Sequence, residues 1–148
     1  MVASGSYNGF LENYHYSRKS EIFQDDKWTD IQDAPKTLAG YAVVFSDGYF
    51  YYFGGGGDLN GAGIIRLNAA SWTWSDGYIG FMAQTARVNH AVITIGNTFM
   101  VLGGHGKKYN EACVMNNDEM TCEKKSSFLQ YFYESPAVFL VNDTYGNC

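Results

Sequence analysis

Two short stretches that end in paired glycines constrain the fold of this 148-residue chain more than any other feature. Residues 49–57 read YFYYFGGGG and residues 99–106 read FMVLGGHG, so an apolar run twice enters a glycine pair. A shift of 49 positions places residues 41–55 on residues 90–104 and superimposes both glycines of each pair. Self-similarity at a fixed period of this size is typical of a repeat architecture.

Each copy contains two apolar runs separated by a polar turn, SDG in the first and GN in the second, which is a β-hairpin signal. Both runs are apolar at successive positions, so we expect both faces of these strands to be covered. The sequence after the glycines aligns at a shift of 48, which places Leu67 with Met115 and Trp74 with Cys122. A second hairpin is therefore expected in each unit, giving four strands per unit.

The repeat divides the chain into two whole units and two partial ones. We expect the end of a preceding unit in residues 1–35, whole units in residues 36–82 and 83–131, and the first strand of a further unit in residues 132–148. Trp28 lies 46 positions before Trp74, which supports the first partial unit.

Four short strands in a unit of 46 to 49 residues, with a glycine pair closing the second strand and a tryptophan in the fourth, resemble the kelch repeat. The glycine pairs match its diglycine, and RVNHAVI at residues 87–93 is similar to its Arg-x-x-His strand start. Trp28 and Trp74 match its tryptophan, whereas Cys122 stands at that position in the second unit. The resemblance covers about residues 20–145.

What the resemblance implies is an all-β fold of kelch-type β-propeller blades, each a four-stranded antiparallel sheet, in an incomplete ring. Because propellers close with about four to eight blades, the ring would be completed by the remaining blades of a longer chain or by other copies of this one. Glycines at the ends of inner strands permit close backbone approach and positive φ. The residues expected to serve the blade structure are Gly54, Gly55, Gly103, Gly104, Trp28, Trp74 and His90.

The composition argues against several classes of function. A net charge of -5 and a pI near 5.0 offer no basic surface for a phosphate backbone, so no nucleic-acid partner is expected. No run of 18 apolar residues occurs and the N-terminal sequence lacks the apolar core of a signal peptide, so no membrane partner is expected either. Scattered histidines without metal-ligand spacing, and the lack of a nucleophile elbow or triad, predict no metal, no cofactor, no catalytic residue and no enzyme.

Two features bear on the compartment. Cys113 and Cys122 flank a turn within one expected hairpin and could form a disulfide, or they could be two reduced, half-buried cysteines. Asn142 begins an NDT triplet that satisfies the N-glycosylation rule. Both features lean toward a secreted parent protein, against the missing signal peptide, so the localisation stays open.

The resemblance implies recognition of a protein partner by loops at the rim of the propeller. These loops join the second to the third strand, at residues 56–63 and 105–112, or connect the units, at residues 32–40 and 81–87. The polar and aromatic side chains proposed for binding are Asp58, Asn60, His105, Lys107, Lys108 and Tyr109. Two alternatives are a fragment of a kelch-type oxidase resembling galactose oxidase, whose copper centre is built from Tyr and His, and a structural repeat protein that self-assembles through exposed blade edges.

Overall fold

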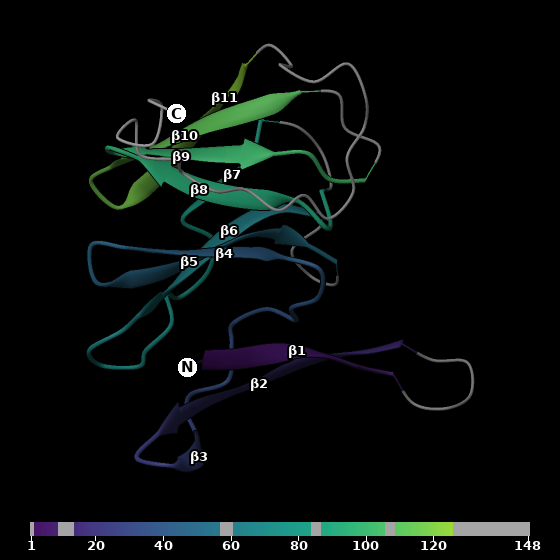
Figure 1. The fold of residues 1–148 in the computed structure, drawn as a ribbon, viewed down its shortest axis with the longest axis vertical. Coiled ribbons are helices and arrows are strands. Elements are labelled where there is room, and N and C mark those ends of the chain that lie inside the picture. The colour runs from purple at the N-terminus through teal and green to yellow at the C-terminus, as the bar shows by residue number, and fades with distance from the viewer. Residues whose placement is uncertain (1, 9–13, 57–60, 84–86, 106–108, 126–148) are drawn as a thin grey trace, which may run out of the picture.

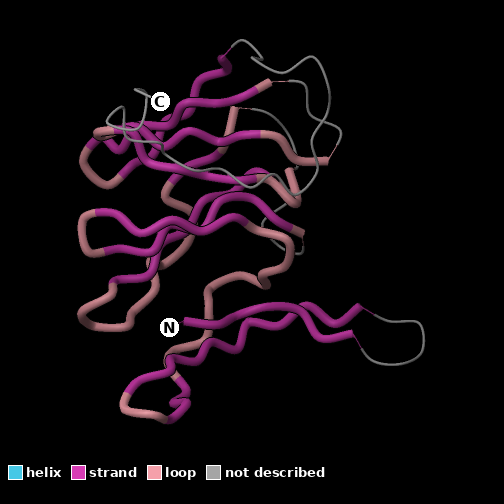
Figure 2. Tube along the Cα trace, in the orientation of Figure 1, coloured by secondary structure: helices cyan, strands magenta, loops and turns pink. Residues whose placement is uncertain are grey.

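The structure of the chain is a computed structural model that describes residues 2–8, 14–56, 61–83, 87–105 and 109–125 (Figure 1). These residues form strands, turns and irregular segments without any helix, so the fold class is all-β, as the sequence predicts (Figure 2). No helix long and apolar enough to cross a membrane is present in these ranges.

The N-terminal part forms a three-stranded antiparallel sheet in the order β1-β2-β3. Its strands are β1 (Val2–Asn8), β2 (Tyr14–Gln24) and β3 (Lys27–Asp30). The chain after β3 continues along β2, because the amide of Ile31 donates to the Ser20 carbonyl and the amide of Leu38 donates to the Ser17 carbonyl. This sheet lies next to the first of two repeated units (Figure 1).

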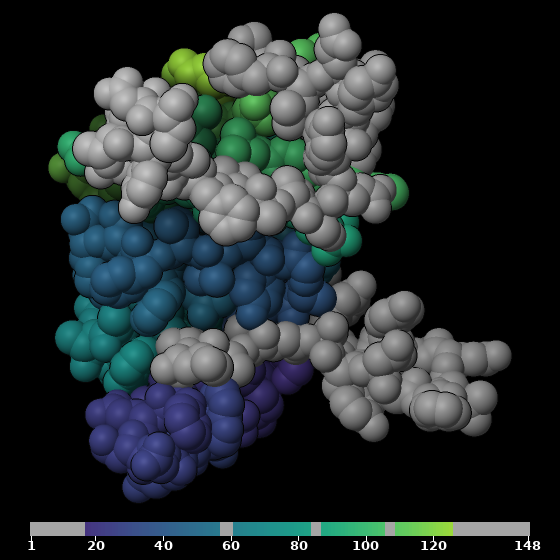
Figure 3. Space-filling model, in the orientation of Figure 1, coloured from purple at the N-terminus to yellow at the C-terminus, as the bar shows by residue number. Residues whose placement is uncertain are grey.

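The two units are antiparallel meanders of four strands each. The first unit contains β4 (Ala42–Ser46), β5 (Tyr49–Gly55), β6 (Gly61–Asn68) and β7 (Gly80–Phe81). The second unit contains β8 (Ala91–Ile95), β9 (Thr98–Leu102), β10 (Asn110–Asn116) and β11 (Glu119–Lys125). In the space-filling view the first unit, blue to teal, lies between the N-terminal sheet, purple, and the second unit, green (Figure 3).

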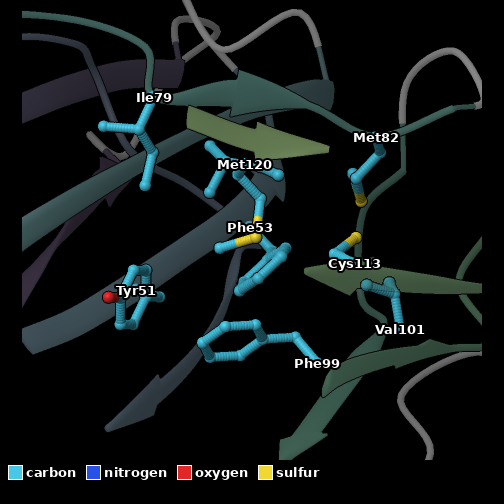
Figure 4. Close-up of a cluster of buried hydrophobic side chains, with 9 residues drawn as sticks. Tyr51, Phe53, Ile79, Met82, Phe99, Val101, Cys113 and Met120 are labelled. Atoms are coloured by element: carbon cyan, nitrogen blue, oxygen red, sulfur yellow. The ribbon is translucent and has the colours of Figure 1, made fainter. Parts of the chain in front are cut away.

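Both units have the same orientation in the stack, which is the arrangement of consecutive propeller blades. Tyr51 and Phe53 of β5 pack against the second unit (Figure 4). Val101 of β9 packs toward the first unit, in the same cluster. It occupies the repeat position of Tyr52, whose ring lies on the opposite face of the first unit, 5.0 Å from the ring of Tyr41. Equivalent side chains therefore face the preceding layer in each unit, and the architecture is propeller-like and incomplete.

A buried cluster fills the space between the units (Figure 4). Its members are Tyr51, Phe53, Ile64, Ile79, Met82, Phe99, Val101, Cys113 and Met120. The ring of Phe99 lies 4.8 Å from that of Tyr51 and 5.6 Å from that of Phe53, which are distances of favourable aromatic pairs. Burial of these large side chains is the main force that holds the second unit on the first.

A second cluster covers the other face of the first unit, and Trp74 is its anchor. It contains Ala34, Leu38, Tyr52, Ile65, Leu67 and Trp74. The indole nitrogen of Trp74 donates to the Gln32 carbonyl at 2.9 Å, which fixes the segment before β4 to the first unit. Trp28 differs, because it lies on the edge strand β3 and is 49% exposed. Its ring lies 5.3 Å from that of Phe23.

The two units are also joined by a pair of strands that the sequence does not indicate. β7 pairs in parallel with β11, and the Met120 amide donates to the Ile79 carbonyl at 2.6 Å. A Cβ on Gly80 would overlap the Met120 carbonyl, so this approach requires glycine. The two meanders thus form one eight-stranded sheet, and its end strands β4 and β8 contact each other, so that the sheet nearly closes.

The sequence predicts that both faces of the apolar strands are covered. This prediction holds for β5 but is wrong for β4 and β8, the first strand of each unit. β5 is buried along its last five residues. Val43 and Phe45 of β4 are 47% and 54% exposed, and Ile95 of β8 is 53% exposed. The reason is that β4 and β8 are the end strands of the sheet, and each has a hydrogen-bonded neighbour strand on one side only.

The predicted alignment of the third strands is wrong by two residues. Phe50 pairs with Leu67, whereas Phe99, its equivalent, pairs with Cys113 rather than with Met115. The connection from Phe99 to Cys113 is shorter than the one from Phe50 to Leu67, which shifts the register without changing the face of the side chains. Trp74 and Cys122 do occupy equivalent positions, because they lie opposite Leu67 and Cys113 respectively.

Cys113 and Cys122 form a disulfide across β10 and β11, in the place that Leu67 and Trp74 take in the first unit. Because the bond closes a loop of sequence separation 9, its reduction is expected to lower the free energy of unfolding by about 2 to 3 kcal/mol. Urea unfolding with and without dithiothreitol measures this change. The Cys113→Ala, Cys122→Ala double variant is the control and should not respond to the reductant; equal stability of the oxidised and reduced wild-type chain would contradict the prediction.

Candidate functional site

The loops proposed for binding meet at the end of the strands that carries the glycine pairs, which we call the diglycine end. The β5–β6 and β9–β10 loops leave the sheet there, and the chain enters β4 and β8 there, at the right of Figure 1. All four paired glycines have positive φ, at 59° for Gly54, 99° for Gly55, 68° for Gly103 and 100° for Gly104. The chain therefore turns out of the second strand in the same way in both units.

Residues 87–90, which we call the connecting segment, hold these loops together through backbone hydrogen bonds. The bonds run from Arg87 N to Gly61 O at 2.5 Å, from Gly55 N to Arg87 O at 2.9 Å, from Asn89 N to Gly40 O at 3.0 Å and from His105 N to Val88 O at 3.0 Å. One short stretch thus joins the segment before β4, the β5–β6 loop and the β9–β10 loop.

A buried ion pair fixes the connecting segment to the second unit. The guanidinium of Arg87 donates to Glu111 Oε1 at 2.8 Å, to the Gly103 carbonyl at 2.5 Å and to the Tyr109 carbonyl at 2.9 Å. The other carboxylate oxygen of Glu111 accepts from the Ala83 amide at 2.6 Å. Both side chains of the pair are fully buried. Such a pair persists only with good geometry and several further hydrogen bonds, which this one has.

His90 ends the connecting segment and is also buried, with 7% of its surface exposed. Neither ring nitrogen makes a hydrogen bond of normal geometry in the described part of the chain, and the Phe53 backbone is the nearby polar group that favours protonation of the ring. Burial, reinforced by the charge of Arg87, lowers the pKa of His90 to about 4, and the Phe53 backbone opposes this only in part. The imidazole is therefore neutral at pH 7 and belongs to the interior of the diglycine end.

Two of the six residues proposed for binding lie in the described ranges, and both are on this end. His105 is exposed in the turn after Gly104. Tyr109 is 38% exposed, and Lys124 Nζ lies 3.3 Å from the centre of its ring. Since Arg87 holds the Tyr109 carbonyl, this ring is presented from a fixed backbone. The other residues, Asp58, Asn60, Lys107 and Lys108, lie outside the described residues, and so does Asn142.

The opposite end holds a cleft between the units that the sequence interpretation missed. It measures about 550 Å³ and is lined by Ser46, Asp47, Tyr49, Tyr51, Arg66, Asn97, Phe99, Met115, Asn117 and Asp118. Arg66 lies 4.5 Å from the centre of the Tyr49 ring and forms an ion pair with Asp118 at 2.7 Å. Burial raises the pKa of the Tyr51 hydroxyl, whereas the adjacent Arg66 lowers it. A single arginine within the apolar strand sequence GIIRLN was the available signal.

Within the described ranges, no three His, Cys, Asp or Glu side chains lie close enough together to hold a metal ion. A scan against protein-family models finds no match for this sequence, and a search of curated proteins finds none.

Proposed function

We propose that this chain is part of a kelch-type propeller and acts as a non-catalytic module that binds a protein partner through the loops of the diglycine end. The observation that supports the proposal most is the connecting segment, which ties loops of both units to one buried ion pair. Binding residues commonly lie on loops that a rigid scaffold positions, because an ordered loop loses less conformational entropy on association.

The proposed surface has the chemistry of a recognition site. Tyr109 supplies an aromatic ring with a polar end, of the kind enriched among the residues that dominate binding energies. His105 precedes it in the same loop sequence, with Lys107 and Lys108 between them. A partner would thus meet two basic residues and an aromatic ring on a loop whose two ends are held by the connecting segment and by Arg87.

The triple variant Lys107→Ala, Lys108→Ala, Tyr109→Ala is expected to bind the partner at least about tenfold more weakly than the wild-type chain, because truncation of a hot-spot residue costs about 2 kcal/mol or more and tyrosine is enriched among such residues. The partner is first isolated on the tagged wild-type chain, and its affinity is then measured by calorimetry with purified components. The control is Ser46→Ala, Asn97→Ala at the opposite cleft, which should leave the affinity unchanged. An unchanged affinity of the triple variant, or a loss in the control, would remove this surface from consideration.

A second proposal, self-assembly, is supported by the exposed apolar side chains of the end strands. Val43 and Phe45 of β4 and Ile95 of β8 are each about half exposed. A further blade or another copy of the chain would cover them. A solution mass that rises with protein concentration favours self-assembly, and a constant monomer mass excludes it.

A further inference from the structure

His90 is a buried histidine in the described part of the chain. It is the last residue of the connecting segment, on which the loops of the diglycine end depend. A Cβ on Gly104 would lie 3.0 Å from the Cβ of His90, so the β9 end packs tightly beside it. The two ring nitrogens make no hydrogen bond of normal geometry in the described ranges. A proton on this ring would thus enter a buried, closely packed site.

The charges around His90 disfavour a second cation there. Arg87, three residues earlier in the same segment, is the cation that acts on the ring. On β10, the carboxylate of Glu111 is already shared between Arg87 and the Ala83 amide. The β5 side contributes the Phe53 backbone, and the β9 side contributes Gly104 and the exposed His105. No free carboxylate among these groups could pair with a protonated His90.

We infer that His90 makes the diglycine end sensitive to pH. In acid, protonation of His90 favours an open state, in which the hydrogen bonds between the connecting segment and the loops are broken; we call this opening the release. The consequence for a partner rests on the proposed function, since opening these loops would disassemble the binding surface. The opening itself is a property of the free chain.

The direction of the effect follows from proton linkage. Above pH 6.5 the ring is neutral whether the segment is closed or open, so His90 does not disfavour the closed state. As the pH falls below about 6.5, His90 binds a proton in the open state but stays neutral in the closed state. The closed state therefore loses stability relative to the open state. The loss levels off near pH 4, where the closed state is protonated as well. Opening should therefore become about 50- to 100-fold more frequent between pH 7.5 and 4.5.

Amide hydrogen exchange on the wild-type chain tests the release. The reporters are the amides of Gly55, Asn89 and His105, which bond to or from the connecting segment, and the reference amides are those of β5 and β6. After correction for intrinsic rates, protection of the three reporters should fall by about 50- to 100-fold between pH 7.5 and 4.5, while the reference amides change much less. Equal loss at reporters and reference, or no loss at all, would overturn the inference.

Two further measurements test the release even if one variant folds poorly. An NMR titration of the wild-type imidazoles should find the His90 ring titrating below pH 5, and a value near 6.5 would overturn the inference. His90→Gln should abolish the acid-induced loss of protection, whereas His105→Gln, which removes an exposed imidazole from the same end, should retain it. Retention of the loss in a folded His90→Gln chain would assign it to another group.

Partner binding separates failure of the release from failure of the proposed function. If the loops bind the partner, the wild-type affinity should weaken in acid more than that of His90→Gln. If the partner binds the loops at pH 7 but its affinity has the same pH dependence for the wild-type chain and for His90→Gln, the release alone would be overturned. A partner insensitive to the loop variant at pH 7 would overturn the proposed function, while the exchange experiment would still decide on the release.

Discussion

Replacement of Glu111 by alanine is expected to lower the free energy of unfolding by about 3 to 5 kcal/mol. The change leaves the Arg87 guanidinium buried without its counterion, and it also removes the acceptor of the Ala83 amide. Urea unfolding followed by circular dichroism measures the loss. Because the ion pair includes Arg87 of the connecting segment, the same variant should also expose the loops of the diglycine end to proteolysis.

Asp118→Ala is the matched control, because it removes a carboxylate from an ion pair of similar length in a different environment. Asp118 lies 2.7 Å from Arg66, but its side chain is 90% exposed. Exposed pairs contribute about 0 to 1 kcal/mol, so this variant should lose no more than that. Similar losses for Glu111→Ala and Asp118→Ala would contradict the importance assigned to the buried pair.

Gly55→Ala is expected to lower the free energy of unfolding by about 2 to 5 kcal/mol, for two independent reasons. The residue has a φ of 99°, which L side chains rarely adopt, and a Cβ would lie 2.5 Å from the Ala39 carbonyl oxygen. The clash cannot be relieved without moving the segment that enters β4. Thermal and urea unfolding measure the loss.

Two other glycines separate the two causes. Gly48 has a φ of 81° and open space around its Cβ position, so Gly48→Ala should show backbone strain alone, at about 1 to 2 kcal/mol. Gly77 has open space and no positive φ, so Gly77→Ala should change stability by less than about 0.5 kcal/mol. If Gly55→Ala were as mild as Gly77→Ala, the account of the glycine pairs would be wrong.

Much of the fold could be predicted from the sequence because the local signals for strands and turns were strong. The apolar runs, the polar turns and the period of 49 residues place β4, β5, β8 and β9 at their observed positions. The second hairpins were harder to align, since the loops before β6 and β10 differ in length and nothing in the sequence marks the register. The pairing of β7 with β11 depends on the absence of one Cβ at Gly80, which no local pattern reveals.

The candidate site was predictable only in outline. The loops follow from the strand order, and RVNH marks the start of the connecting segment. The partner of Arg87 could not be identified, because Glu111 lies 24 residues away and reads as an ordinary loop carboxylate. The cleft around Arg66 brings together residues 52 positions apart, from a strand of one unit and a turn of the other. Such pairings depend on how the units stack, which the sequence alone does not specify.

We propose that the loops of both units form one pre-organised surface on the connecting segment. Amide hydrogen exchange at pH 7 tests it most directly, at the three reporters Gly55, Asn89 and His105. If one cooperative opening releases all three, their opening free energies should agree within about 0.5 kcal/mol, and Glu111→Ala should lower them together. Opening free energies that differ by about 2 kcal/mol or more, or that respond separately to the substitution, would contradict a single surface.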